Sequence, residues 1–473
     1  VLVSAWAHDY APRVRCLVLA SPAFKVKLYV PFARSGLKLM SRMRGNFFVN
    51  SYVKAKFLTH DPARIQSYEN DQLITRAISV RILLGLYEAA DRVVADAQAI
   101  HVPLQLLVSG ADWVVHRAPQ LEFFERLGSA TKELHVLPGF YHDTLGEKER
   151  SSALDKIRAF IRRMYEQRPQ NLSLLQAHER GYTADEEKRL SAPLAALSPR
   201  KLKFGLVRLS MRTLGRLSDG IRLGIRTGFD SGSTLDYVYR NHASGITPLG
   251  RIIDRNYLNS IGWRGIRVRK DHLQRAIAAA ARFLGAAGRP VRIADIAAGH
   301  GRYVLEAVEK LPALPEIIVL RDYSDINVRD GAALIAQKNL QHVAHFVKAN
   351  AFDEEGVASL APRPTIAIVS GLYELFPDNA PVMASLRGLA RAVEPGGYLI
   401  YTGQPWHPQL ELIARTLSSH RGGSAWVMRR RTQAELDQLV ANAGFTKLEQ
   451  WTDEWGIFTV SLSARVPADA GHA

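Results

Sequence analysis

Short apolar runs alternate with helix-forming segments through the C-terminal half of the chain. The runs are VRIADI (291–296), EIIVLRD (316–322), HVAHFVKANAF (342–352), TIAIVS (365–370) and GYLIYTG (397–403). A helix with a glycine stop follows at 431–445, and residues 447–466 predict two paired strands. Strands that alternate with helices predict a parallel sheet covered by helices on both faces.

A second set of apolar runs lies near the N-terminus, in RVRCLVLASPAF (13–24), VPLQLLVSGADWVV (102–115) and KELHVLPGFYHDTLGEKER (132–150). Each run predicts a buried strand. The second strand ends in an acid, Asp112, and a histidine, His142, lies in the loop after the third. The segment between the first two strands is rich in predicted helix.

The connector between these halves begins as a polar, proline-punctuated segment at 167–199. Residues 201–228 then predict one basic amphipathic helix. Its apolar residues recur at helical spacing, and arginines recur every four residues on another face: Val207, Met211, Leu214, Leu217 and Ile221, with Arg208, Arg212 and Arg216. Such a helix suits an anionic lipid surface. It equally suits packing against a neighbouring domain with its arginines in solvent.

Composition supports two domains and a connector. The 473 residues are 47% hydrophobic and 23% charged, as in ordinary globular proteins, and no apolar run approaches the length of a membrane span. A single cysteine, Cys16, excludes an internal disulfide framework and favours a cytoplasmic location. The net charge is +17, divided as +7 over 1–166, +7 over 167–227 and +3 over 228–473. Because the excess is densest in the connector, we expect no nucleic-acid partner, and peripheral contact with an anionic inner membrane becomes a hypothesis.

Candidate chemistry lies on the turn after the strand at 291–296. Asp295, Ala297, Gly299 and Gly301 form a turn of small residues that a ligand can approach closely, and Asp322 ends the next strand. A dinucleotide turn normally carries a third glycine three positions after the second, and none occurs here. The pattern therefore favours a ligand without a pyrophosphate over NAD.

The series IADIAAGHG, LRDYSD, ANAFD, AIVSGLYELF, VEPGGYL and QAELDQLVANAGF resembles the ordered motifs of class I S-adenosylmethionine (SAM) dependent methyltransferases, over residues 285 to 465. The stretches SGSTLDYVYRN, GWRGIR, SGLYELFPDN and TGQPWHPQLELIAR are similar to a bacterial methyltransferase family and extend the resemblance back to about residue 228. The resemblance implies a Rossmann-like domain with a seven-stranded, mostly parallel sheet.

The same resemblance implies a cofactor site for SAM. Asp295 would fix the turn and the side of the methionyl amine, Ala297, Gly299 and Gly301 would wall the methionine and ribose, and Asp322 would accept hydrogen bonds from the ribose hydroxyls. The adenine would lie beside three residues after the third strand, and the site would include a serine after the fourth: Asn350, Ala351, Phe352 and Ser370. Ala297 stands where many members have glycine, and Asn350 where many have aspartate. Neither residue excludes SAM.

The methyl acceptor is expected beyond the fourth and fifth strands. Glu374 and His407 are candidate general bases, while Tyr373 and Trp406 would form an apolar wall. Residues 237–270 predict a helical cap over this pocket. Arginines of the cap would pair with a phosphate or carboxylate of the acceptor, or form salt bridges to the domain surface.

The N-terminal strands resemble the latter half of an α/β-hydrolase of the monoacylglycerol lipase or lysophospholipase type, grouped with S33 serine aminopeptidases. The resemblance implies that Asp112 and His142 are the acid and base of a triad, with a lid over about 25–96. No Gly-x-Ser-x-Gly motif occurs in the 473 residues, so we expect the nucleophile upstream of Val1 and no hydrolysis by residues 1–473 alone.

The sequence thus predicts an α/β protein in which a truncated hydrolase (1–166), a connector (167–227) and a SAM-dependent methyltransferase (228–473) are fused. The expected acceptor is a small molecule or a lipid, and no metal is expected. Two alternatives stay open: an NAD-binding oxidoreductase that uses the same turn, and a non-catalytic membrane adaptor that binds through the connector.

Overall fold

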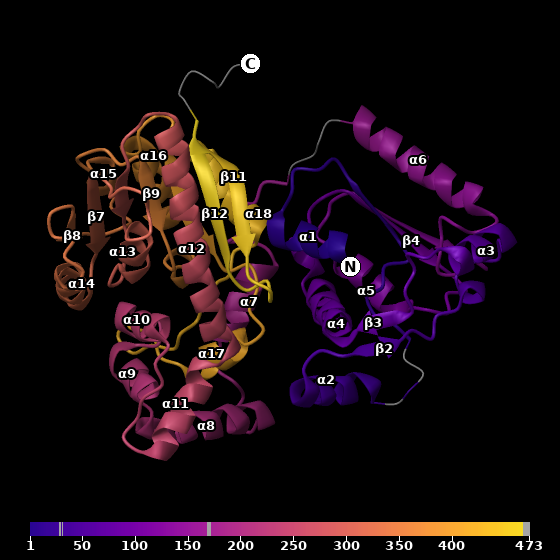
Figure 1. Cartoon of the computed structure of the whole chain (residues 1–473), viewed down its shortest axis with the longest axis horizontal. Coiled ribbons are helices and arrows are strands. Elements are labelled where there is room, and N and C mark those ends of the chain that lie inside the picture. The colour runs from indigo at the N-terminus through magenta and orange to yellow at the C-terminus, as the bar shows by residue number, and fades with distance from the viewer. Residues whose placement is uncertain (28–29, 31, 168–171, 467–473) are drawn as a thin grey trace. The chain divides into compact units, whose positions relative to one another are not determined.

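The computed structural model describes residues 1–27, 30, 32–167 and 172–466, in two compact units (Figure 1). Unit 1 runs from Val1 to Leu172 and unit 2 from Ser173 to Ala473. Unit 2 therefore includes most of the connector that the sequence separated from the methyltransferase half. Residues 168–171 of the connector, residues 28, 29 and 31 of the expected lid and residues 467–473 lie outside the described part. No described helix combines the length and apolarity needed to cross a bilayer.

Unit 1 has a parallel sheet in the order β1-β4-β5, formed by the three strands predicted for the N-terminal half. These are β1 (Leu17–Ala20), β4 (Leu104–Ser109) and β5 (Lys132–Leu137). The other elements are α1 (Leu2–Tyr10), α2 (Ala33–Arg44), β2 (Phe48–Asn50), η1 (Ala55–Phe57), α3 (Pro62–Asn70), β3 (Ala77–Ser79), α4 (Val80–Ala95), η2 (Ala97–Ala99), α5 (Ala118–Arg126) and α6 (Arg150–Glu166).

Helix α4 departs from the expected lid over residues 25–96. Ala90, Val93 and Val94 of this helix are buried in the same core as the sheet residues Leu104 and Leu106. The apolar face of α4 thus packs on the sheet, so α4 belongs to the body of unit 1.

Unit 2 contains the predicted seven-stranded sheet, in the order β11-β12-β10-β9-β6-β7-β8. The strands are β6 (Arg292–Asp295), β7 (Ile317–Asp322), β8 (Ala344–Lys348), β9 (Ile366–Val369), β10 (Tyr398–Gly403), β11 (Phe445–Thr452) and β12 (Thr459–Arg465). Strands β6 to β10 are parallel, and β12 pairs antiparallel with both β10 and β11. The fold class predicted from the sequence is confirmed.

Two apolar cores lie on opposite faces of this sheet. Successive residues of β9 show the division, since Ile368 packs into one core and Ala367 and Val369 into the other. The first core includes residues of α12 (Ile261–Ala286), α13 (Arg302–Val308) and α14 (Asp325–Gln337), and the second includes residues of α15 (Glu354–Ala358), α16 (Asn379–Ala392) and α18 (Gln433–Asn442). Both faces are therefore covered, as a parallel sheet requires.

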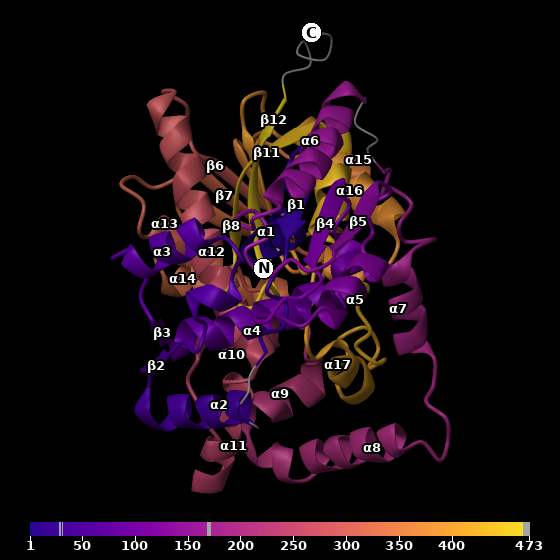
Figure 2. The ribbon, with the colours of Figure 1, turned by 90° about the vertical axis from the view of Figure 1, so that its right-hand side faces the viewer.

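The carboxyl ends of the parallel strands face a group of smaller helices (Figures 1 and 2). The group comprises α7 (Tyr182–Ser191), α8 (Pro199–Arg212), η3 (Leu214–Leu217), α9 (Asp219–Thr227), α10 (Gly232–Arg240), α11 (Pro248–Leu258) and α17 (Leu410–Thr416). Between β9 and α16 lies the short turn η4 (Tyr373–Leu375).

The prediction of a single helix over 201–228 is wrong in one respect, because helical geometry is interrupted twice in this segment. Thr213 leaves helical geometry with φ −103° and ψ −90°. Ser218 then begins α9, where its hydroxyl accepts a hydrogen bond from the backbone N–H of Ile221. The apolar stripe is consequently divided among α8, η3 and α9.

Candidate functional site

The turn after β6 has the backbone that its small residues predicted. Gly299 and Gly301 have φ values of 59° and 73°, a region that favours glycine. A Cβ atom at Gly301 would lie 2.4 Å from Cδ1 of Leu320 on β7. The positive φ and this close approach both favour glycine at position 301.

Asp322, at the end of β7, bonds the same turn. Its Oδ2 accepts from the backbone N–H of Gly299 at 3.0 Å, and its Oδ1 accepts from Ser324 N at 3.0 Å. A carboxylate offers about four acceptor positions, so two remain for hydroxyl donors. The position suits the predicted contact with ribose hydroxyls.

Asp295 is fully buried beneath the turn. One carboxyl oxygen accepts from Ala297 N at 3.2 Å, and the other accepts from the Tyr303 hydroxyl. Burial raises the pKa of Asp295 to about 7. Its observed contacts hold the turn, which agrees with the first of its two predicted roles.

The other predicted cofactor residues follow β8 and β9. Asn350 is exposed and its Oδ1 accepts from Phe352 N at 3.0 Å, while the Phe352 ring packs 4.6 Å from that of Phe376. Ala351 is buried among apolar residues. Ser370 is buried, and its Oγ has no hydrogen-bond partner among the described residues.

These residues meet where the strand order reverses between β6 and β9, the usual ligand position of such sheets. Three features fit SAM: a turn that favours glycine at 301, a carboxylate with spare acceptor positions, and an unpartnered buried hydroxyl at Ser370. The residues that would hold the cofactor are therefore those at the ends of β6 to β9.

Helix α10 packs over the glycine turn. A Cβ atom on Gly299 would lie 3.4 Å from Cα of Gly232, at the start of this helix. Asp236 of α10 binds Arg302 of α13, with Oδ1 2.5 Å from Nε. Burial would raise the pKa of Asp236, but hydrogen bonds from His300 and Arg302 lower it to about 2. An ion pair thus fastens α10 to the helix that follows the turn.

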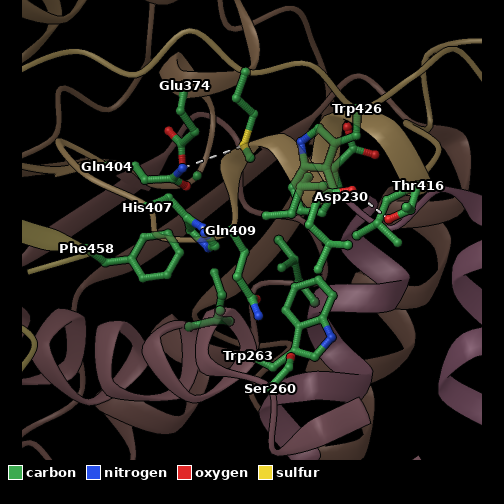
Figure 3. A pocket seen from close by; sticks show the side chains of 18 of the residues that line it. Asp230, Ser260, Trp263, Glu374, Gln404, His407, Gln409, Thr416, Trp426 and Phe458 are labelled. Atoms are coloured by element: carbon green, nitrogen blue, oxygen red, sulfur yellow. Dashed lines mark hydrogen bonds between the residues drawn. The ribbon is translucent and has the colours of Figure 1, made fainter. Parts of the chain in front are cut away.

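A cavity of about 200 Å³ lies beside the ends of β9 and β10, and Figure 3 shows side chains that line it. Its walls are mostly apolar and come from the small helices and from loops after β10. Trp263 of α12 stacks on Trp426 with ring centroids 6.2 Å apart, and Phe458 adds a third ring. Val207 and Met211 of α8 line the cavity as well.

Two buried charges face each other at the strand end of the cavity. Nη1 of Arg269 lies 3.4 Å from Oε1 of Glu374, and the two side chains are 2% and 8% exposed. Glu374 Oε2 has no partner among the described residues. Burial raises the pKa of Glu374, although the nearby Arg269 opposes the rise. Glu374 therefore lines the cavity with a carboxyl group whose proton affinity is higher than usual, and it stays a candidate general base.

His407 also lines the cavity, beside Phe458. Its Nδ1 accepts a hydrogen bond from Gln409 N at 3.0 Å, which requires the proton to be on Nε2. Burial lowers the pKa of His407 to about 4, so the ring is neutral near pH 7. His407 consequently presents a hydrogen-bond donor, and the assignment as a base is corrected.

Tyr373 and Trp406 do not line the cavity, contrary to the predicted wall. The 3₁₀ turn η4 directs Tyr373 into the core, where its hydroxyl lies 3.0 Å from Ser385 Oγ. Trp406 lies under the Arg430 guanidinium, 5.6 Å from it. The wall is formed instead by Trp263, Trp426 and Phe458.

Part of the cavity carried a sequence signal. Trp263 and Arg269 belong to the segment 237–270 that was expected to cap the pocket, and they do line it. Trp426 and Phe458 come from loops whose position depends on tertiary packing. No pattern in the sequence distinguished them from core aromatics.

In unit 1 the two predicted triad residues are brought together. His142 Nδ1 lies 2.8 Å from Asp112 Oδ2, while Asp112 Oδ1 accepts from the backbone of Val114 and Val115 at 2.7 and 2.9 Å. Burial would raise the pKa of Asp112, but the hydrogen bond with His142 and these backbone donors lower it. This geometry is that of the acid and base of a serine hydrolase.

The fold and these sites define a two-part α/β protein, a lipase-like unit followed by a methyltransferase-like unit. Comparison with known families agrees. The model of the family described as "Putative methyltransferase" matches residues 157–465, and that of "Serine aminopeptidase, S33" matches residues 1–149. The chain belongs to the methyltransferase family, and its N-terminal part is a hydrolase domain of the S33 serine aminopeptidase and lipase type.

The chain is also similar to individual proteins. "Uncharacterized protein YnbC" of Escherichia coli (strain K12) is 56% identical over 465 residues, which are 98% of this chain and 79% of the relative. "Phospholipase YtpA" of Bacillus subtilis (strain 168) is 27% identical over 154 residues, 32% of this chain and 58% of that protein. A solved structure of SAM-dependent methyltransferases from Methanosarcina mazei is 20% identical, covering 37% of this chain and 93% of that one with a TM-score of 0.30.

Proposed function

We propose that unit 2 binds SAM at the ends of β6 to β9 and transfers its methyl group to an amphipathic acceptor held in the cavity. One observation supports this proposal more strongly than any other. A mostly apolar cavity ends at a buried, half-satisfied carboxylate, Glu374, directly after the strand that adjoins the glycine turn. An apolar cavity that contains a small number of polar groups is typical of a small-molecule site.

SAM, when bound, supplies a methyl group that is already activated, so the protein mainly has to position the acceptor. The stacked Trp263 and Trp426 would hold its apolar part, and His407 would donate from Nε2 to a polar atom. Glu374 would take up, at Oε2, the proton that an acceptor hydroxyl or carbon acid loses. Arg269 keeps its positive charge whether the neighbouring Glu374 is protonated or ionised.

The cofactor site is tested by replacing Asp322 with alanine. Loss of a charged hydrogen-bonding partner should weaken SAM binding by about 1.5–3 kcal/mol, or roughly 10- to 150-fold in Kd. Isothermal titration with SAM measures this directly. Asp325→Ala is the matched control, because Asp325 begins the next helix with its side chain 81% exposed. Unchanged SAM affinity in Asp322→Ala, or tight binding of NAD by the parent protein, would contradict the assignment.

The pair in unit 1 supports a second activity. We infer that Asp112 and His142 are the acid and base of an esterase or lipase centre that uses a serine nucleophile. In a longer chain that hydrolyses acyl esters, His142→Ala should reduce kcat by at least about 10³-fold. His135→Ala is the control, since His135 lies on β5 and pairs with Glu133. Hydrolysis that survives in His142→Ala would refute the inference.

A further inference from the structure

Helix α8 forms part of the cavity wall and exposes a stripe of leucines to solvent. Leu202, Leu206 and Leu209 are spaced four and three residues apart and are 58–68% exposed. More exposed apolar residues lie on η3 and at or just before the start of α11, and the hydrogen bond from Ile246 N to Leu217 O at 3.0 Å joins these two segments. The further exposed residues are Leu214, Ile246, Leu249 and Ile252. We call these seven side chains the leucine face.

The segments that carry this face contain several basic residues and no acidic ones. No Asp or Glu occurs between Pro199 and Leu217 or between Gly245 and Ile253. The basic residues of the two segments are Arg200, Lys201, Lys203, Arg208, Arg212, Arg216 and Arg251. Arg200 binds Glu411 and Arg208 donates to Arg415 O, whereas the others form no ion pair with the described part of the chain. Exposed leucines among unpaired cations fit a surface that is both apolar and anionic.

The opposite side of α8 points into the protein. Val207 and Met211 line the cavity, and Phe204 is buried. One helix thus separates the leucine face from the cavity, and α17, which supplies Leu412 and Ile413, forms the adjoining wall. The acyl chain of a lipid that enters beside α8 would therefore meet Val207 and Met211 at the wall of the cavity.

We propose that the leucine face docks unit 2 on an anionic lipid bilayer and that the methyl acceptor is an amphipathic lipid which enters the cavity beside α8. The leucines insert at the headgroup boundary, and the lysines and arginines contact the anionic headgroups. The second half of this statement rests on the proposed methyl transfer. Docking itself does not, so the two are tested separately.

Docking is measured by sedimentation of the full chain with vesicles of phosphatidylglycerol and of phosphatidylcholine. We expect binding to the anionic vesicles that weakens with salt, because screening acts within about 8 Å at physiological ionic strength. Replacing Arg208, Arg212 and Arg216 with glutamine should weaken binding by about 100-fold, the effect expected from three cations at an anionic surface. Replacing Arg282, Lys310 and Arg329 with glutamine changes the charge equally and should have little effect, since these residues are exposed elsewhere.

A second variant isolates the apolar contribution. Leu206→Gln with Leu209→Gln should also reduce vesicle binding while SAM affinity stays constant, because both side chains are already exposed to solvent. Equal binding to phosphatidylcholine, or equal loss in the control triple variant, would overturn the proposal. So would a concentration-dependent dimer that these leucine substitutions abolish, since the face would then be an interface between copies. If vesicles bind but no lipid gains a methyl group from labelled SAM, docking stands and the lipid acceptor fails.

Discussion

Replacing Glu374 with glutamine is expected to slow methyl transfer by about 10²- to 10⁴-fold, the usual contribution of a general base. The amide keeps the shape of the side chain but cannot take up a proton at Oε2. SAM affinity should stay within a factor of about three, because Glu374 lies in the cavity and not at the glycine turn or at Asp322. The readout is the transfer of a deuterated methyl group from SAM into a lipid extract, followed by mass spectrometry.

The pH dependence provides an independent check on Glu374. Only the ionised carboxylate acts as a base, so the rate should rise with pH through the pKa of Glu374, which burial places above its ordinary value. Arg269→Met should move this inflection to higher pH, because it removes the cation 3.4 Å away. Glu309→Gln is the control, since Glu309 binds Lys338 at the surface. A flat profile together with an active Glu374→Gln variant would exclude the carboxylate as the base.

The sheet of unit 2 was predictable because its signal is local. Each central strand is a short apolar run bounded by turn residues. A strand that is buried on both faces can be predicted from its own residues, because it is apolar throughout. The glycine turn was equally predictable, since Gly299 and Gly301 adopt the positive φ values that glycine permits. The resemblance of several motifs to one family then indicated SAM as the expected cofactor.

The acceptor side was less predictable because neighbouring residues point in opposite directions there. Tyr373 and Glu374 are adjacent, yet the 3₁₀ turn directs the first into the core and the second into the cavity.

The interruption of the helix near residue 213 was also not predictable from the spacing of residues. The spacing of apolar residues fits one continuous helix, but Gly215 packs against Ile221, where a Cβ atom would lie 3.1 Å from Cγ2, and Ser218 starts a new helix. Such features follow from tertiary packing, which periodicity does not encode.

Replacing Asp295 with asparagine is expected to stabilise unit 2, and increasingly so as the pH rises. An unfolded aspartate ionises near pH 4, whereas burial holds the folded-state pKa at about 7. The buried carboxyl therefore favours folding only when protonated, and this advantage is lost between roughly pH 4 and pH 7. The three-unit difference corresponds to a cost on the order of 4 kcal/mol above pH 7. Asparagine avoids this cost and can still accept from Ala297 N.

The measurement is denaturant unfolding without SAM at pH 4.5 and pH 8, followed by tryptophan fluorescence, because unit 2 contains five of the seven tryptophans. Asp295→Asn should exceed the parent protein in stability at pH 8 and differ little at pH 4.5. Asp236→Asn is the control of opposite sign. Its folded-state pKa of about 2 lies below the unfolded value, so the ionised group stabilises the fold above pH 4 and the variant should lose on the order of 2 kcal/mol at pH 8. A stability difference for Asp295→Asn that does not change with pH would show that this carboxyl is ionised in the folded protein, and that the turn beneath the cofactor site contains a buried negative charge.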